Sequence, residues 1–137
     1  MGCRKFVWGR AAIGALAVCL AACGGGSSPT APSGGGGSGT GAVGATLTIS
    51  ASGVISPSQV TIAVGQSVMV VNNDSRAHQI ASDPHPLHTD CPPMSQLGTI
   101  GAGQSRTTGA LTTARTCGVH DHDDPGNTNL QGRIVIQ

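Results

Sequence analysis

The sequence predicts an all-β domain, a Greek-key sandwich or barrel of about seven to eight strands. Its 22 glycines and 8 prolines among 137 residues argue against a helical bundle and favour a turn-rich β protein. Short apolar runs rich in β-branched residues, bounded by glycine, proline, asparagine and aspartate, are typical of strands. No segment keeps a helical apolar period for more than about two turns, so we expect no long helix.

The expected strands are short and follow one another closely along the chain. Aromatic residues make up 1% of the sequence, so the core must be built from valine, isoleucine, leucine and methionine. Such a core is thin for a small domain, and a covalent or metal cross-link would help to stabilise it. The apolar runs that predict strands lie at 47–49, 60–64, 68–71, 79–80, 97–100, 117–119 and 134–136.

Charge and hydropathy exclude two classes of protein. The formal net charge is +1 and charged residues make up 9% of the chain, so there is no basic field to attract nucleic acid. No apolar segment reaches the roughly 18 to 20 residues that a membrane-spanning helix needs. We therefore expect neither a nucleic-acid-binding protein nor an integral membrane protein.

The N-terminal segment has the pattern of an export signal. Three basic residues precede an apolar run over residues 11–22, as in a secretory signal peptide. The run ends in Leu-Ala-Ala-Cys at residues 20–23, which resembles the bacterial lipobox. We expect residues 1–22 to be a removed lipoprotein signal peptide and Cys23 to carry the lipid. Gly24 after the cysteine favours the outer membrane, so the expected location is the cell envelope, facing the periplasm or the cell surface.

The next segment is expected to be a flexible tether that begins with the lipidated cysteine and spans residues 23–44. It consists mostly of glycine, serine and proline, a composition that cannot bury enough apolar surface to fold. A coil of about 21 residues has an r.m.s. reach of roughly 25 Å. The folded domain is then expected over residues 45–137, held away from a lipid surface.

All five histidines of the chain fall in this domain. His120 and His122 are two residues apart, so on a strand both side chains project from the same face. His85 and His88 lie in a loop stiffened by prolines, which loses less entropy when it closes over an ion. His78 follows a turn at the start of the next expected strand. Together the five imidazoles predict a metal site, although a loose surface cluster of histidines remains the alternative.

Carboxylates near these histidines have expected roles as well. Asp121 is expected to face away from the two histidines that flank it. Asp90, Asp123 and Asp124 are candidates to orient imidazoles by hydrogen bonds. Imidazole ligands without thiolate suit Cu(II), zinc and nickel, and affinity among divalent ions peaks at copper.

Two cysteines remain in the domain besides Cys23. An exported chain with Cys91 and Cys117 favours a disulfide between them. That bond would close a loop of about 25 residues and stabilise the domain by roughly 3 kcal/mol. It would also join the proline-rich histidine loop to the strand of His120.

From Ser56 onward, over about 80 residues, the chain carries one pattern of spaced residues, made up of Pro57, Val60, Ile62, Val64, Gly65, Val68, Val71, Asn72, Asn73, Asp74, His78, Cys117, His120 and the run 130–136. In this pattern it resembles the cupredoxin family of plastocyanin- and azurin-like proteins. In a blue copper protein of that family the matching ligands would be His78, Cys117, His120 and an axial methionine, at whose position Leu130 stands here. The resemblance implies a cupredoxin-type sandwich or barrel and copper as the cofactor.

Other features depart from the blue copper pattern. His122 is added, and the loop Asp83-Pro84-His85-Pro86-x-His88 has no counterpart in blue copper proteins. The chain is more similar to a cupredoxin-like bacterial subgroup with such a loop and a His-x-His motif. That resemblance implies a copper site built from imidazoles, with Cys117 a ligand only in the blue copper alternative.

We therefore expect a membrane-tethered, exported, monomeric copper protein that acts in electron transfer or copper handling. Its expected partners are the lipid bilayer that holds its anchor and a redox or copper-exchange protein. Two alternatives stay open: a copper enzyme of superoxide-dismutase type, and a metal-free structural surface domain.

Overall fold

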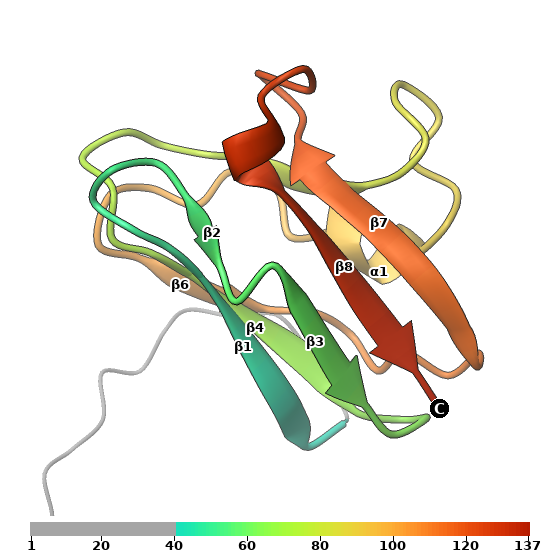
Figure 1. Ribbon diagram of the computed structural model, residues 1–137. Helices are drawn as coiled ribbons and strands as arrows, with labels where there is room; N and C mark the ends of the chain where they lie inside the picture. The colour runs from blue at the N-terminus through green and yellow to red at the C-terminus, as the bar shows by residue number, and fades with distance from the viewer. Residues whose placement is uncertain (1–40) are drawn as a thin grey trace, which may run out of the picture. The chain divides into compact units, whose positions relative to one another are not determined.

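The computed structural model describes residues 41–137 (Figure 1). The expected signal peptide, Cys23 and most of the expected tether lie outside these described residues. The first strand, β1, spans Val43–Ile49, so it includes the last two residues that the sequence assigned to the tether. No helix within residues 41–137 is long and apolar enough to cross a membrane.

Residues 41–137 form eight strands in two four-stranded sheets, in agreement with the predicted all-β sandwich (Figure 1). One sheet has the order β2-β1-β4-β6 and the other β3-β8-β7-β5. β1 pairs with β4 in parallel, β3 pairs with β8 in parallel, and the remaining pairs are antiparallel. After β1 the strands span Ile55–Ser56 (β2), Gln59–Ile62 (β3), Ser67–Asn72 (β4), Ile80–Ser82 (β5), Ser105–Thr107 (β6), Arg115–Asp121 (β7) and Gln131–Ile136 (β8).

The apolar core lies between the two sheets. Strand alternation produces it directly, because in β3 Val60 and Ile62 are buried while their neighbours are exposed. The largest fully buried side chains include Leu47, Ile49 and Ile134, and no aromatic residue contributes to the core of the described domain. This confirms the expected aliphatic core.

One expected strand is absent. Residues 97–100 form a turn and a single bridge between Ile100 and His78 instead of a strand. The cause is the short helix α1 over Pro92–Ser95, which is followed by Gly98 at a φ of 63°, a left-handed conformation that interrupts an extended run. The apolar-run pattern missed β6, because its three residues are largely polar.

The loop between β5 and α1 folds back against β7. Within it the amide of His88 donates to the carbonyl of Pro84 at 2.8 Å. The amide of Asp83 donates to the carbonyl of Gly118 on β7 at 2.9 Å. At the end of the loop, Cys91 forms the predicted disulfide with Cys117, with the two Cα atoms 5.9 Å apart.

Candidate metal centre

Four of the five histidines gather on the outward face of β7. Cys117, Val119 and Asp121 point into the domain and are nearly fully buried, so Gly118 and His120 lie on the opposite face. The loop after β5 covers that face and brings its two histidines over the strand. The ring centroids of His85, His88, His120 and His122 lie 4.9 to 5.5 Å apart in the five pairs in contact.

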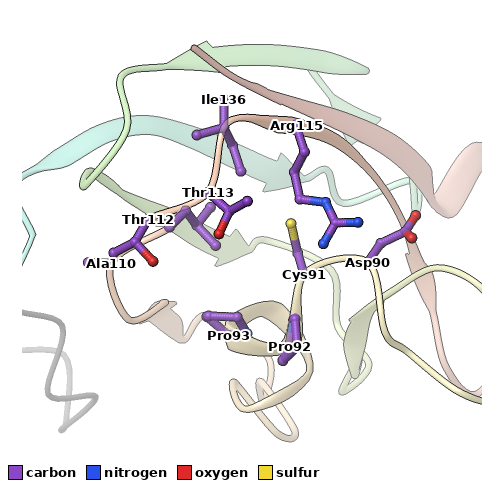
Figure 2. Close-up of a pocket in the computed structure, with 10 residues that line it drawn as sticks. Asp90, Cys91, Pro92, Pro93, Ala110, Thr112, Thr113, Arg115 and Ile136 are labelled. Atoms are coloured by element: carbon purple, nitrogen blue, oxygen red, sulfur yellow. The ribbon is translucent and has the colours of Figure 1, made fainter.

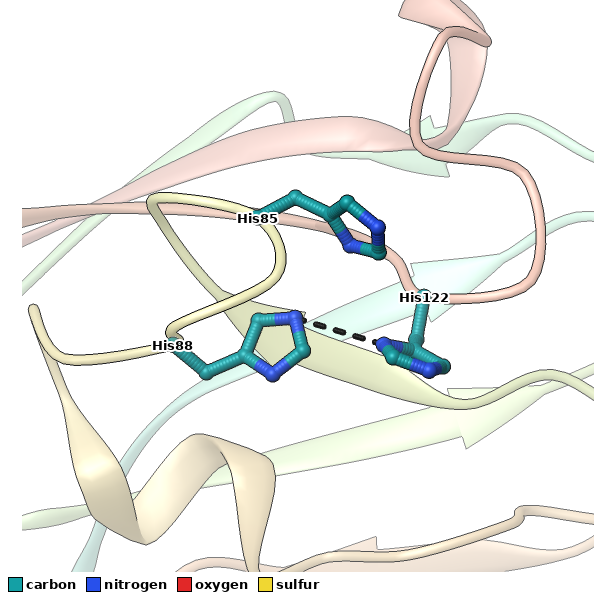
Figure 3. A group of neighbouring side chains, drawn as sticks. All are labelled: His85, His88 and His122. Atoms are coloured by element: carbon teal, nitrogen blue, oxygen red, sulfur yellow. Dashed lines mark hydrogen bonds between the residues drawn. The ribbon is translucent and has the colours of Figure 1, made fainter.

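Three of these imidazoles already offer ligand atoms to a common point. One nitrogen from each of His85, His88 and His122 lies within 4.8 Å of the other two (Figure 3). His122 Nδ1 is 3.3 Å from His88 Nε2. Metal–imidazole bonds are about 2.0 to 2.1 Å long, so ligands opposite each other across an ion are about 4 Å apart. Small side-chain rotations are enough to close the three rings on one ion.

The fourth imidazole, His120, is prepared for coordination by its hydrogen bonding. His120 is 3% exposed, and its Nδ1 lies 2.6 Å from Asp83 Oδ1. An ionised carboxylate only accepts hydrogen bonds, so Nδ1–H donates and Nε2 carries the lone pair. Nε2 is buried and has no hydrogen-bond partner in the described domain. A buried acceptor without a partner is costly, and a metal ion would satisfy it.

Gly118 makes the contact between Asp83 and His120 possible. A Cβ built at Gly118 would lie 2.7 Å from Asp83 Cγ and would overlap its Oδ2. The carboxylate therefore occupies space that only a glycine leaves free. Asp83 is therefore the carboxylate that orients an imidazole by a hydrogen bond. The expected candidates, Asp90, Asp123 and Asp124, form no side-chain hydrogen bond to an imidazole in the described domain. The only sequence feature that pointed to Asp83 for this role is its position at the start of the histidine loop.

The electrostatics of the cluster favour a neutral ring at His88. Burial lowers the pKa of His88 below its usual 6.5, and the neighbouring imidazoles of His122, His120 and His85 lower it further. Asp83 acts in the opposite direction and is the smaller influence. Neutral imidazoles present the lone pairs that a metal ion needs.

His78 is not part of this cluster. It is 2% exposed, and its ring lies between two carboxylates, with Nδ1 2.7 Å from Asp121 Oδ2 and Nε2 3.0 Å from Asp74 Oδ2. The hydrogen bond with His78 lowers the pKa of Asp74 from 3.8 to about 2. A ring nitrogen that donates to a carboxylate has no free lone pair for a metal. The structure thus brings together four of the five histidines predicted as ligands.

Cys117 also stands apart from the imidazoles. Its sulfur is bonded to Cys91 on the inward side of β7, so it offers no thiolate in this structure. A hollow of about 220 Å³ lies beside this disulfide, and Figure 2 shows the Cys91 sulfur and the Arg115 side chain turned toward it. None of the histidines lines this hollow.

Comparison with solved structures identifies the fold. The chain is similar to a mutant plastocyanin of fern, with 14% identity and a TM-score of 0.53 over 67% of this chain and 99% of that one. It is also similar to a purple cupredoxin from Nitrosopumilus maritimus, with 18% identity and a TM-score of 0.50 over 68% and 99% of the two chains. A mutant of amicyanin in its Cu(I) form shares 16% identity at a TM-score of 0.52, over 70% and 82%. No protein family and no curated protein matches the sequence. The domain therefore has the cupredoxin fold.

Proposed function

We propose that this domain binds one copper ion through His85, His88, His120 and His122 and that it handles copper in the cell envelope. The observation that carries the proposal is the convergence of ligand nitrogens from His85, His88 and His122, beside the ring of His120, whose buried Nε2 has no partner. When bound, copper supplies a centre that can change its charge by one electron. The chain supplies the ligands, orients His120 through Asp83, and covers the inner part of the site with the histidine loop.

The donor set and the fold together support copper over other metals. Imidazole nitrogens suit copper, zinc and nickel, and copper binds such sites most tightly among the divalent ions. Calcium and magnesium prefer oxygen ligands, whereas the cluster presents nitrogens. The similar amicyanin structure is described as a Cu(I) form, which is consistent with copper in this fold.

Copper storage or delivery fits the site better than electron transfer. Thiolate and thioether ligands favour Cu(I), and the sulfur of Cys117 is held in a disulfide. The all-nitrogen site therefore favours Cu(II) over Cu(I), whereas an electron carrier must hold both states. His85 is exposed, so one ligand is accessible to an incoming copper acceptor. Electron transfer remains the second candidate because the domain shares the fold of plastocyanin and amicyanin.

The cellular setting belongs to the same proposal. The lipobox-like residues 20–23 support export and a lipid anchor at Cys23. The Cys91–Cys117 disulfide supports an oxidising compartment. A tethered monomer facing the periplasm or the cell surface would exchange copper with a soluble or membrane-bound protein.

Copper titration tests the proposal. The mature chain carrying Cys23→Ser, which prevents lipidation, should bind one Cu(II) per chain in isothermal titration calorimetry. His120→Ala removes the best-oriented ligand and should weaken binding at least about 100-fold. Asp123→Asn is the matched control, since its side chain bonds to no imidazole, and should bind as the parent does. Absence of stoichiometric binding in the parent, or unchanged binding in His120→Ala, would overturn the proposal.

A further inference from the structure

A second polar group lies on the inner side of β7, behind the metal centre. It consists of Asp74, His78 and Asp121, whose side chains are 6%, 2% and 3% exposed. Asp121 stands between His120 and His122 in sequence but points to the opposite side of the strand. Buried charged groups of this kind are costly unless each one is paired, so they require a structural reason.

The Asp121 carboxylate holds the backbone of two residues next to His122, one that follows it in the chain and one opposite it. Its Oδ1 accepts hydrogen bonds from the amides of Gln79 and Asp123, each at 3.2 Å. The amide of His122 in turn donates to the carbonyl of Gln79 at 2.8 Å. Residue 122 lies just beyond the end of β7, and its amide is held by this one backbone hydrogen bond to Gln79. The carboxylate therefore adds two hydrogen bonds to the backbone bond that holds the position of a proposed ligand.

His78 holds the other oxygen of this carboxylate. Its Nδ1 is 2.7 Å from Asp121 Oδ2, while Asp74 Oδ2 lies 3.0 Å from its Nε2. The backbone of His78 is fixed by reciprocal hydrogen bonds with Ile100 at 3.0 and 2.8 Å. Asp74 is fixed by its own amide, which donates to Asn72 Oδ1 at 2.9 Å. The chain of contacts thus runs from the rigid end of β4 through His78 to the backbone of His122.

We propose that His78 is a positioning residue for the copper site, which acts through Asp121 to set the place of His122. This inference rests on the proposed function and goes beyond it, because it assigns to His78 a role other than ligation. Without His78, the Asp121 carboxylate is left buried and unpaired. It then turns toward water and releases the amides of Gln79 and Asp123, so that His122 loses its fixed position.

The test compares Asp121→Ala, Asp121→Asn and His78→Gln in the mature Cys23→Ser chain. Asp121→Ala removes both acceptors and should weaken Cu(II) binding by about 10- to 100-fold, as loss of a group that orients a ligand does. Asp121→Asn keeps an oxygen for the two amides and should recover most of the affinity. His78→Gln should shift the Cu(II) electron paramagnetic resonance parameters while pulsed measurements still count the same number of coordinated imidazoles as in the parent.

A control variant separates positioning from a general loss of stability. Ile136→Val shortens a core side chain at the far end of β8 and should lower the melting temperature without changing the copper spectrum.

Loss of one coordinated imidazole in His78→Gln would show that His78 is a ligand and would overturn the inference. An unchanged spectrum and affinity in folded His78→Gln and Asp121→Ala would overturn it as well. If His78→Gln fails to fold, the copper affinities of Asp121→Asn and Asp121→Ala still test the inference, because only Asp121→Asn keeps an oxygen for the two amides. A parent chain that binds no copper would instead defeat the proposed function itself.

Discussion

At the scale of single residues, the site depends on how one imidazole is oriented. His120 presents Nε2 to the cluster because Asp83 accepts from its Nδ1, and Asp83 reaches it because residue 118 is glycine. A carboxylate that fixes the tautomer of a ligating histidine also raises its basicity. Gly118 therefore affects metal binding although it offers no ligand atom.

Gly118→Ala tests this dependence. The added Cβ overlaps the Asp83 carboxylate, which is 47% exposed and can turn outward, so the fold should survive while His120 loses its acceptor. We expect copper affinity to fall about 10- to 100-fold with little change in melting temperature. Gly126→Ala is the matched control, because a Cβ there meets nothing within 4 Å. Equal copper affinity in the two variants would contradict the role of Gly118.

The carboxylate of Asp74 gives a prediction about pH. Its pKa is lowered from 3.8 to about 2, chiefly by the hydrogen bond with His78 and against the effect of burial. Because the folded chain binds this proton less readily than the unfolded chain, the contribution to stability is complete above the unfolded pKa. It is lost as the pH falls from about 3.8 through about 2.

Thermal melts of the metal-free chain between pH 2 and pH 6 measure this contribution. The melting temperature of the parent should fall across the acidic end of the range. Asp74→Asn should be less stable above about pH 4 and should show a shallower fall below it. Parallel profiles for the two proteins would contradict the assignment.

At the scale of elements, the metal centre is a contact between β7 and the loop that follows β5. The disulfide joins these two segments, three residues beyond His88 in the loop and three residues before His120 in the strand. It fixes the approach of the two ligand pairs without lying among them. The cross-link and the site are therefore coupled through the backbone.

Removing the disulfide separates stability from coordination. Cys91→Ser with Cys117→Ser should lower the free energy of unfolding by about 3 kcal/mol, as expected for a cross-link of this sequence separation. At temperatures where the variant is folded, it should still bind one copper ion. Chemical denaturation and copper titration on the same sample give both results. Loss of copper from a folded double variant would contradict the separation of stability from coordination.

The sequence predicted which strand face each site residue takes better than it predicted the contacts between distant segments. Alternation in 117–122 correctly separated the outward histidines from Asp121, because strand periodicity alone decides which face a side chain takes. It could not show that β5 would bring the loop to the outward face of β7, since strand order is not encoded locally. Residues 97–100 were wrongly expected to form a strand because the apolar pattern outweighed the turn at Gly98. His78 was grouped with the other histidines and matched to a ligand position of the blue copper pattern, because its contact with Asp121, distant in sequence, is set by the tertiary fold.

At the scale of the whole molecule, residues 41–137 combine the cupredoxin fold with a cluster of four imidazoles. Identities of 14% to 18% with plastocyanin, purple cupredoxin and amicyanin accompany a shared β-sandwich. In this chain the interior end of the sandwich holds the Asp74–His78–Asp121 group, whereas the imidazole cluster lies outside the sheet. The Asp74–His78–Asp121 group and the imidazole cluster lie on opposite faces of the same strand, β7. The loop after β5 carries two of the four proposed ligands, and the end of β7 carries the other two.

The most direct test of the central claim is the visible and electron paramagnetic resonance spectrum of the mature Cys23→Ser chain loaded with one Cu(II). An all-imidazole site predicts a weak visible band and a wide copper hyperfine splitting, with several coordinated imidazoles in pulsed measurements. An intense blue charge-transfer band with narrow splitting would show that Cys117 is a thiolate ligand, and would contradict both the disulfide and the four-histidine site.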